Sequence, residues 1–246
     1  MFATTDRSGR SNHDHKFLLS ALGLIAILLV SGCTTTGSVK QIDRLDSVDD
    51  NARFLIMTPD VRYYLLTAGG VPQPHAEWTK AAQINFANAL QDYVDERRIE
   101  IVALPEQDQL SELETDYQKL YAAVGSTVLA HHYGPVKLPA KKGVFDWSLG
   151  PGVQEIGARY GADYALFSFY RDYQATGGRV ALSFFAAIMG VGVATGGEVG
   201  YASLVDLRTG DIVWFNKVTT GAGELRDEET ARTTVDELFK NLPHRI

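Results

Sequence analysis

Hydrophobic positions along the chain follow two different periods, and the shorter apolar runs predict strands. These runs are rich in β-branched and aromatic residues and end at glycine or proline. The run Tyr164–Tyr170 is apolar on both faces, which predicts a central strand covered by helices on at least one side. Arg208-Thr209-Gly210 separates two further runs and predicts a hairpin whose turn uses the positive φ of glycine. The predicted strands are 54–57, 61–67, 99–104, 162–173, 197–207 and 211–219.

Longer segments repeat apolar residues at spacings of three and four, which predicts amphipathic helices. In the second of these segments, Ser111 and Glu114 have the spacing of a capping box. The third ends at Gly161, and the last begins with three acidic residues, which the helix dipole favours there. The predicted helices are 75–97, 108–133, 153–160 and 227–242. Together the elements predict an α/β (α+β) domain, a small mixed sheet flanked by helices with a C-terminal β-hairpin and helix.

One apolar segment, 180–195, contains no charged residue. Its large side chains are Phe184, Phe185, Ile188 and Met189, among alanines and glycines. As a helix it is about 24 Å long, too short to span a bilayer comfortably. It fits either a buried helix packed on the sheet or a surface for membrane contact or self-association.

The N-terminus has the layout of an export signal. Residues 1–16 are polar and carry three basic side chains, and Phe17–Val30 is an uncharged apolar run. A helix of that length reaches only about 21 Å, which favours a cleaved signal over a permanent anchor. Structure is expected to begin at Ala52, after a small, polar segment that predicts a flexible tether.

The apolar run ends in Val30-Ser31-Gly32-Cys33, which resembles the bacterial lipobox. The resemblance implies diacylglycerol on Cys33, further acylation and cleavage in front of that residue. Thr34 stands where an aspartate would imply inner-membrane retention, so the resemblance implies an outer-membrane lipoprotein facing the periplasm, with the inner membrane as the alternative. The predicted organisation is a signal peptide at 1–32, a lipidated tether at 33–51 and one domain at 52–246.

Net charge and cysteine content exclude some classes of partner and site. Removing residues 1–32 takes away three of 23 basic and two of 30 acidic residues, which leaves a net charge of −8 and argues against nucleic-acid binding. The single cysteine excludes an internal disulfide and a cysteine-rich metal site.

Candidate chemistry is sparse. The chain has no phosphate-binding loop and no nucleophile elbow, and Gly190-Val191-Gly192 lacks the third glycine of a dinucleotide fingerprint. His131 and His132 are adjacent on a predicted helix, so their side chains should point in different directions, and they fit a helix C-terminus better than a metal site. No catalytic, cofactor-binding or metal-binding residue is predicted.

Two further segments carry a family resemblance. Ile156–Leu166 looks like a helix that ends on glycine before Ala-Asp opens a strand, and Val205–Trp214 looks like a hairpin with Thr-Gly at its turn. With the lipobox, they resemble envelope lipoproteins related to the curli-secretion channel subunit and to lipoprotein activators of penicillin-binding proteins. The resemblance implies a non-enzymatic protein-binding or assembly factor, with a self-associating pore or secretion-channel subunit that uses 180–195 as the alternative.

Overall fold

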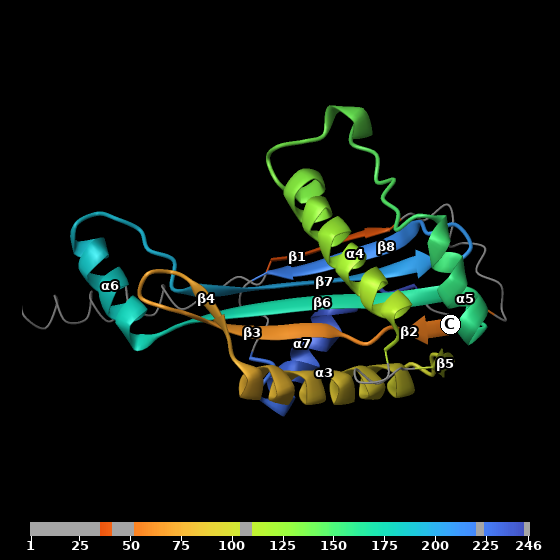
Figure 1. Ribbon diagram of the computed structural model, residues 1–246, viewed down its shortest axis with the longest axis horizontal. Coiled ribbons are helices and arrows are strands. Elements are labelled where there is room, and N and C mark those ends of the chain that lie inside the picture. The colour runs from red at the N-terminus through yellow and green to blue at the C-terminus, as the bar shows by residue number, and fades with distance from the viewer. Residues whose placement is uncertain (1–34, 41–51, 104–109, 220–223, 244–246) are drawn as a thin grey trace, which may run out of the picture. The chain divides into compact units, whose positions relative to one another are not determined.

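The computed structural model describes residues 35–40, 52–103, 110–219 and 224–243, all within one compact unit, Thr34–Ile246. The described residues form one eight-stranded mixed sheet and five α-helices, which confirms the predicted α/β class (Figure 1). The strands are β1 (Thr35–Lys40), β2 (Phe54–Ile56), β3 (Asp60–Leu66), β4 (Pro72–Pro74), β5 (Ile101–Ala103), β6 (Tyr164–Ala175), β7 (Gly196–Asp206) and β8 (Ile212–Thr219). The helices are α3 (Ala76–Glu96), α4 (Glu112–Val128), α5 (Gln154–Tyr160), α6 (Gly177–Ile188) and α7 (Glu228–Leu238).

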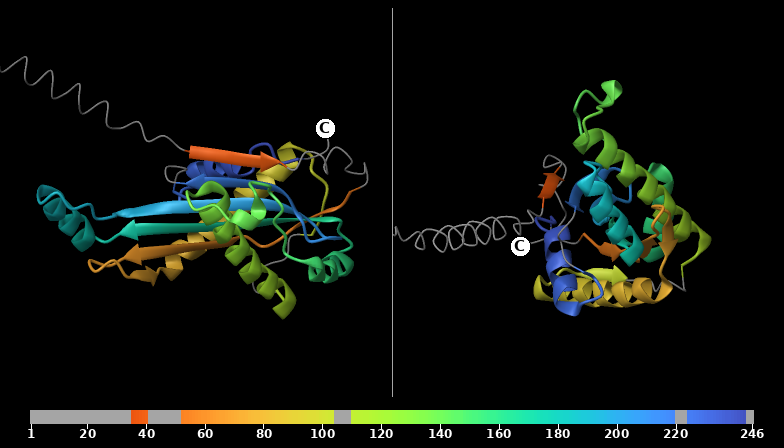
Figure 2. Two further views of the ribbon diagram at one scale, coloured as in Figure 1. Left: turned by 90° about the horizontal axis from the view of Figure 1, so that it is seen from above. Right: turned by 90° about the vertical axis from the view of Figure 1, so that its left-hand side faces the viewer.

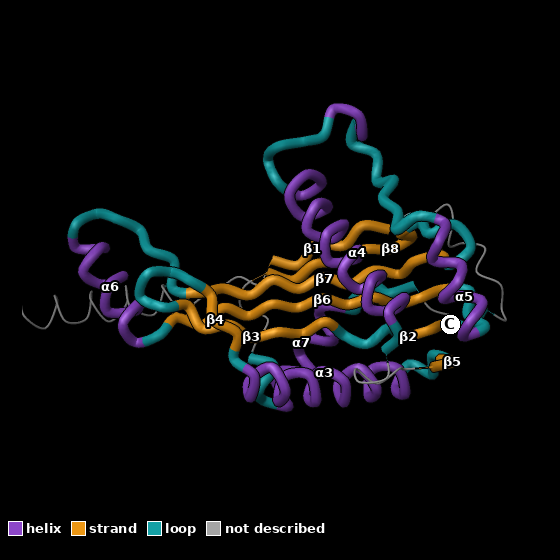
Figure 3. The backbone as a smooth tube through the Cα atoms, viewed as in Figure 1, coloured by secondary structure: helices purple, strands orange, loops and turns teal. Residues whose placement is uncertain are grey.

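The sheet is organised around β6. One side of β6 pairs antiparallel with β7, and β8 and β1 follow in order. On the other side, β2 runs parallel to the first part of β6 and β3 runs parallel to its second part (Figure 3). Thr58-Pro59 separates β2 from β3, because proline has no N–H to donate to a sheet.

Helices cover both faces of this sheet (Figures 1 and 2). On one face, α3 and α7 bury aromatic and aliphatic side chains against the strands, with Phe86 and Phe239 in edge contact. On the other face, α4, α5 and the segment around Trp147 pack on the alternate strand residues. The predicted central strand is therefore apolar on both faces because each face contacts its own layer of helices.

The predicted hairpin is formed by β7 and β8, with Gly210 at φ +82°. A Cβ on Gly210 would lie 2.1 Å from the carbonyl oxygen of Gly150. The position therefore requires glycine for both its backbone conformation and this close approach.

The structure corrects the sequence analysis at two strands. Thr35–Lys40 was expected in a flexible tether but forms β1, antiparallel to β8. The short edge strand β4 was not predicted, and it pairs with β3 across the turn that contains Gly70. Cys33 and residues 41–51 of the expected tether lie outside the described residues.

Candidate functional site: the apolar helix α6

The apolar segment forms α6 and the loop that returns from it to β7. The N–H groups of Arg179 and Val180 donate to the carbonyl oxygen of Thr176 at 2.9 and 3.0 Å, which starts the helix. Gly190 follows the helix with φ +75°, the left-handed conformation that commonly ends a helix. The segment thus has the local signals of a complete helix joined to the sheet at both ends.

No residue of α6 is buried. The exposed fractions of Phe184, Phe185, Ile188 and Met189 are 68%, 64%, 72% and 81%. Of the two alternatives left open by the sequence, a helix buried on the sheet is therefore wrong, and an exposed apolar surface agrees with the structure. The reason is position: α6 lies beyond the ends of β6 and β7, where no sheet face is available to cover it (Figures 1 and 2).

Arg179 secures the base of α6. Its Nε donates to the carbonyl oxygen of Ala194 at 2.6 Å, which joins the start of the helix to the end of the returning loop. Its guanidinium also lies against the β3–β4 turn, since a Cβ on Gly70 would be 2.8 Å from Nη1. Val71 in that turn is exposed as well, so the turn adds apolar surface at this end of the sheet.

The α6 surface, meaning the exposed side chains of Phe184, Phe185, Ile188 and Met189, is suited to an apolar partner. Removing a large apolar side chain from water contributes about 1.5–3 kcal/mol. Four such side chains on one short helix, with no charge between Val180 and Thr195, provide a sizeable driving force for leaving water. A helix that is apolar around its circumference is ordinarily surrounded by protein or lipid.

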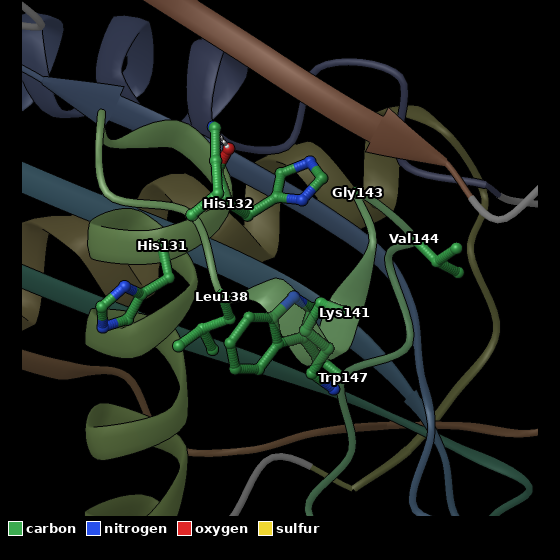
Figure 4. Close-up of a pocket in the computed structure, with 8 residues that line it drawn as sticks. His131, His132, Leu138, Lys141, Gly143, Val144 and Trp147 are labelled. Atoms are coloured by element: carbon green, nitrogen blue, oxygen red, sulfur yellow. Dashed lines mark hydrogen bonds between the residues drawn. The ribbon is translucent and has the colours of Figure 1, made fainter.

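A separate, concave site lies between the end of α4 and the loop that follows it (Figure 4). It is a cavity of about 160 Å³. α4 continues as a π-helical turn, Leu129–Tyr133, whose His131 and His132 both line the cavity although their rings point apart. The remaining lining residues are Lys137, Leu138, Lys141, Gly143, Val144 and Trp147.

The polar groups of this cavity hold the loop in place. The Lys137 ammonium donates to the carbonyl oxygen of His132. Lys141 lies 4.5 Å above the centre of the Trp147 ring and forms a 2.8 Å ion pair with Asp146. Burial and the charge of Lys137 lower the pKa of His132, so that imidazole is neutral at pH 7. Among the described residues, no three histidine, cysteine, aspartate or glutamate side chains come together as metal ligands would.

The buried charged side chains all have structural partners. Arg171 forms a 2.6 Å ion pair with Asp60 and so joins β6 to β3. Asp172 accepts a hydrogen bond from Gln174 at 2.8 Å, and burial raises the pKa of its carboxyl group. Within the described ranges, the two other buried charged residues are Glu114, paired with Arg159, and Asp206, paired with Arg208.

The predicted lipid attachment residue, Cys33, lies outside the described residues, and lipidation stays a prediction. Within the described part of the chain, no helix has the length and apolar character needed to cross a membrane. Apolar composition located the segment that carries the α6 surface but did not place it, because composition alone does not distinguish core from exposed surface.

Comparison with known proteins does not assign the chain to a family. No protein-family model matches the chain, and no curated protein matches its sequence. Among solved structures, the PelC dodecamer from Paraburkholderia phytofirmans in space group P6 gives a TM-score of 0.41 at 11% identity, covering 87% of this chain and all of the other. A single-substitution variant of that dodecamer, in space group C2, gives a TM-score of 0.39 at 12% identity and covers the same share of this chain. TM-scores below 0.5 do not establish a common fold.

Proposed function

We propose that this protein is a lipid-anchored, non-enzymatic lipoprotein of the cell envelope that acts as a binding or assembly factor. Its anchor is the lipid on Cys33, and Thr34 after it favours the outer membrane, with the domain facing the periplasm. The observation that carries the proposal is the α6 surface, a set of large apolar side chains exposed together at one end of the sheet.

The buried charged groups support binding rather than catalysis. An active site ordinarily holds titratable groups in a cleft with a perturbed pKa and access to substrate. Here Glu114, Arg171 and Asp206 are each buried in an ion pair that joins or caps secondary structure. Stabilising pairs of this kind suit a rigid platform that presents surfaces to partners.

A second candidate is an oligomeric subunit of a pore or secretion channel. The observation that favours it is the set of small residues on the same segment, including Ala186, Ala187 and Gly190, which permit close approach of a neighbouring helix. In that case the α6 surfaces of several copies contact one another.

The test combines acylation with partner capture in the native bacterium. Palmitate label is expected in the wild-type protein, whereas Cys33→Ser is expected to stay unlabelled and to accumulate as the larger precursor. Crosslinking of the wild-type protein is expected to recover envelope proteins, or multiples of this chain if it is a channel subunit. Equal labelling of both forms would exclude the anchor. Turnover of a cell-wall or lipid substrate by purified protein without any crosslinked partner would exclude the binding role.

A further inference from the structure

The position of α6 in the sheet is set by strand pairing. β6 leads into the helix and β7 leads out of it, and their last paired residues are Gln174 and Gly196. α6 therefore extends from the end of the sheet that this pair defines, which we call the α6 end.

Strand pairing also places the start of β1 at the α6 end. Thr35 pairs with Thr219 of β8, and Thr219 pairs with Val199 of β7. Val199 is three residues from Gly196, so this row lies about 10 Å along the strands from the last pair. β1 then runs from Thr35 to Lys40, away from the α6 end (Figure 2). The described part of β1 thus begins nearer to the α6 end of the sheet than to the opposite end.

Cys33 precedes Thr35 by two residues, and two residues reach at most about 7 Å. A lipid on Cys33 therefore holds the α6 end of the sheet, rather than the opposite end, at the membrane. The flexible tether expected from the sequence would have allowed any orientation, but a strand that begins so close to the acylated residue does not.

The size and chemistry of α6 fit the membrane interface. A helix of 12 residues is about 18 Å long, well short of the roughly 30 Å hydrocarbon core. A helix of this length can enter the bilayer only part of the way, with its apolar side chains among the outer parts of the acyl chains. The single charged residue of α6, Arg179, stands at the start of the helix against the β3–β4 turn, away from Phe184, Phe185 and Ile188, so no charge would have to enter the acyl-chain region with them.

A second copy of the chain is a poorer match for the same surface. Stable protein interfaces involve about 20–30 residues on each side and a rim of polar residues. The apolar segment provides only the 16 residues of Val180–Thr195, none of them charged. It is therefore small for a protein interface and lacks the charged groups that would surround one.

We infer that the α6 surface inserts into the same bilayer that holds the lipid on Cys33, so that lipid and helix together fix the domain's orientation at the membrane. This inference rests on the lipid anchor of the proposed function. The partner of the α6 surface is therefore the outer part of the acyl-chain region of the bilayer.

Fluorescence quenching in reconstituted membranes tests the inference. Cys33 is the only cysteine, and its thiol is blocked once acylated, so Phe185→Cys provides the only free thiol of the mature protein. The full-length acylated variant is labelled with bimane and reconstituted into vesicles of phosphatidylethanolamine and phosphatidylglycerol. Ile84→Cys on α3, which replaces another exposed apolar helical residue, is the matched control. Unsubstituted protein measures any labelling of Cys33 itself.

The label at position 185 is expected to lose most of its emission to nitroxide-bearing lipids and little to aqueous iodide, and the label at position 84 is expected to do the reverse. Quenching of both labels by iodide alone would overturn the inference. Protection of position 185 from both quenchers, together with crosslinked multimers, would instead assign the surface to a second copy. Palmitate labelling is scored separately on the unsubstituted protein. Absence of palmitate label would show that Cys33 carries no lipid anchor. Lipid quenching at position 185 in a Cys33→Ser background would still establish membrane contact by α6.

Discussion

At the scale of single residues, Glu114 is a buried carboxylate that accepts hydrogen bonds from three other residues. Its side chain is 1% exposed and accepts hydrogen bonds from the Ser111 backbone at 2.6 Å and from Arg159 at 2.7 Å. Burial alone would raise the pKa of this carboxyl group, but the hydrogen bonds from Ser111, Arg159 and Tyr160 outweigh it, and the pKa is lowered. The predicted capping box is confirmed, with an ion pair to α5 that periodicity did not predict.

Because the pKa of Glu114 is lower in the folded state than in the unfolded state, its ionised form stabilises the fold at neutral pH. That contribution is lost as the pH falls below about 4 towards the folded-state pKa. Glu114→Gln is therefore expected to lower the free energy of unfolding by about 1–2 kcal/mol at pH 7 and by less at pH 3. Urea denaturation at the two pH values measures the difference. The exposed Glu112→Gln is the control, and an equal loss for Glu114→Gln at both pH values would contradict the assignment.

Gly210 is the second position where one residue decides local structure. Its φ of +82° and the close Gly150 carbonyl both exclude a side chain, whereas Gly143 has φ +80° with no atom within 4 Å of a Cβ. Gly143→Ala should therefore lower the free energy of unfolding by about 1–2 kcal/mol, from backbone strain alone. Gly210→Ala should lower the free energy of unfolding by clearly more, because the Gly150 carbonyl must also move. Denaturant midpoints of the two variants measure the contribution of the contact, and equal losses would show that the hairpin adjusts freely.

At the scale of elements, α3 and α6 show how position determines burial. Both helices are rich in apolar residues, but α3 packs its apolar stripe on the sheet and α6 has no sheet face beside it. The difference arises because α3 lies against one face of the sheet, whereas α6 continues from the end of β6 (Figure 1).

This difference predicts opposite effects of the same substitution. Phe185→Asp on α6 should change the free energy of unfolding by no more than about 0.5 kcal/mol, since the side chain is exposed. The Leu90 side chain on α3 is 0% exposed. Leu90→Asp should therefore lower the free energy of unfolding by several kcal/mol, because it buries an unpaired charge. Thermal unfolding followed by circular dichroism compares the two variants. A Phe185→Asp protein that melts as early as Leu90→Asp would show that α6 is part of the core.

At the scale of the compact unit Thr34–Ile246, the sheet has two covered faces and one end with an uncovered apolar helix. Both hydrophobic clusters rely on β6, which contributes alternate residues to each. The long antiparallel ladder between β6 and β7 continues to the base of α6, so the helix is attached to the most extensively paired strands of the sheet. A rigid attachment of this kind suits a surface that has to hold a fixed position.

The sequence by itself determined the features that depend on neighbouring residues. Periodicity of two and of three to four located the main strands and helices, because both periods follow from local backbone geometry. The turn at Gly210 and the capping box at Ser111 and Glu114 were predictable for the same reason, since each is completed within a few residues. The apolar segment was located correctly, and only its surroundings were left open.

Tertiary structure alone decided the rest, because those features depend on residues far apart in the chain. β1 became a strand only through hydrogen bonds to β8, whose residues are more than 170 positions away, and its own sequence carries no strand pattern. His131 and His132 share a cavity because a π-helical turn and a later loop meet there. The exposure of α6, and the start of β1 nearer to the α6 end of the sheet, follow from the order and register of the strands, which no local pattern specifies.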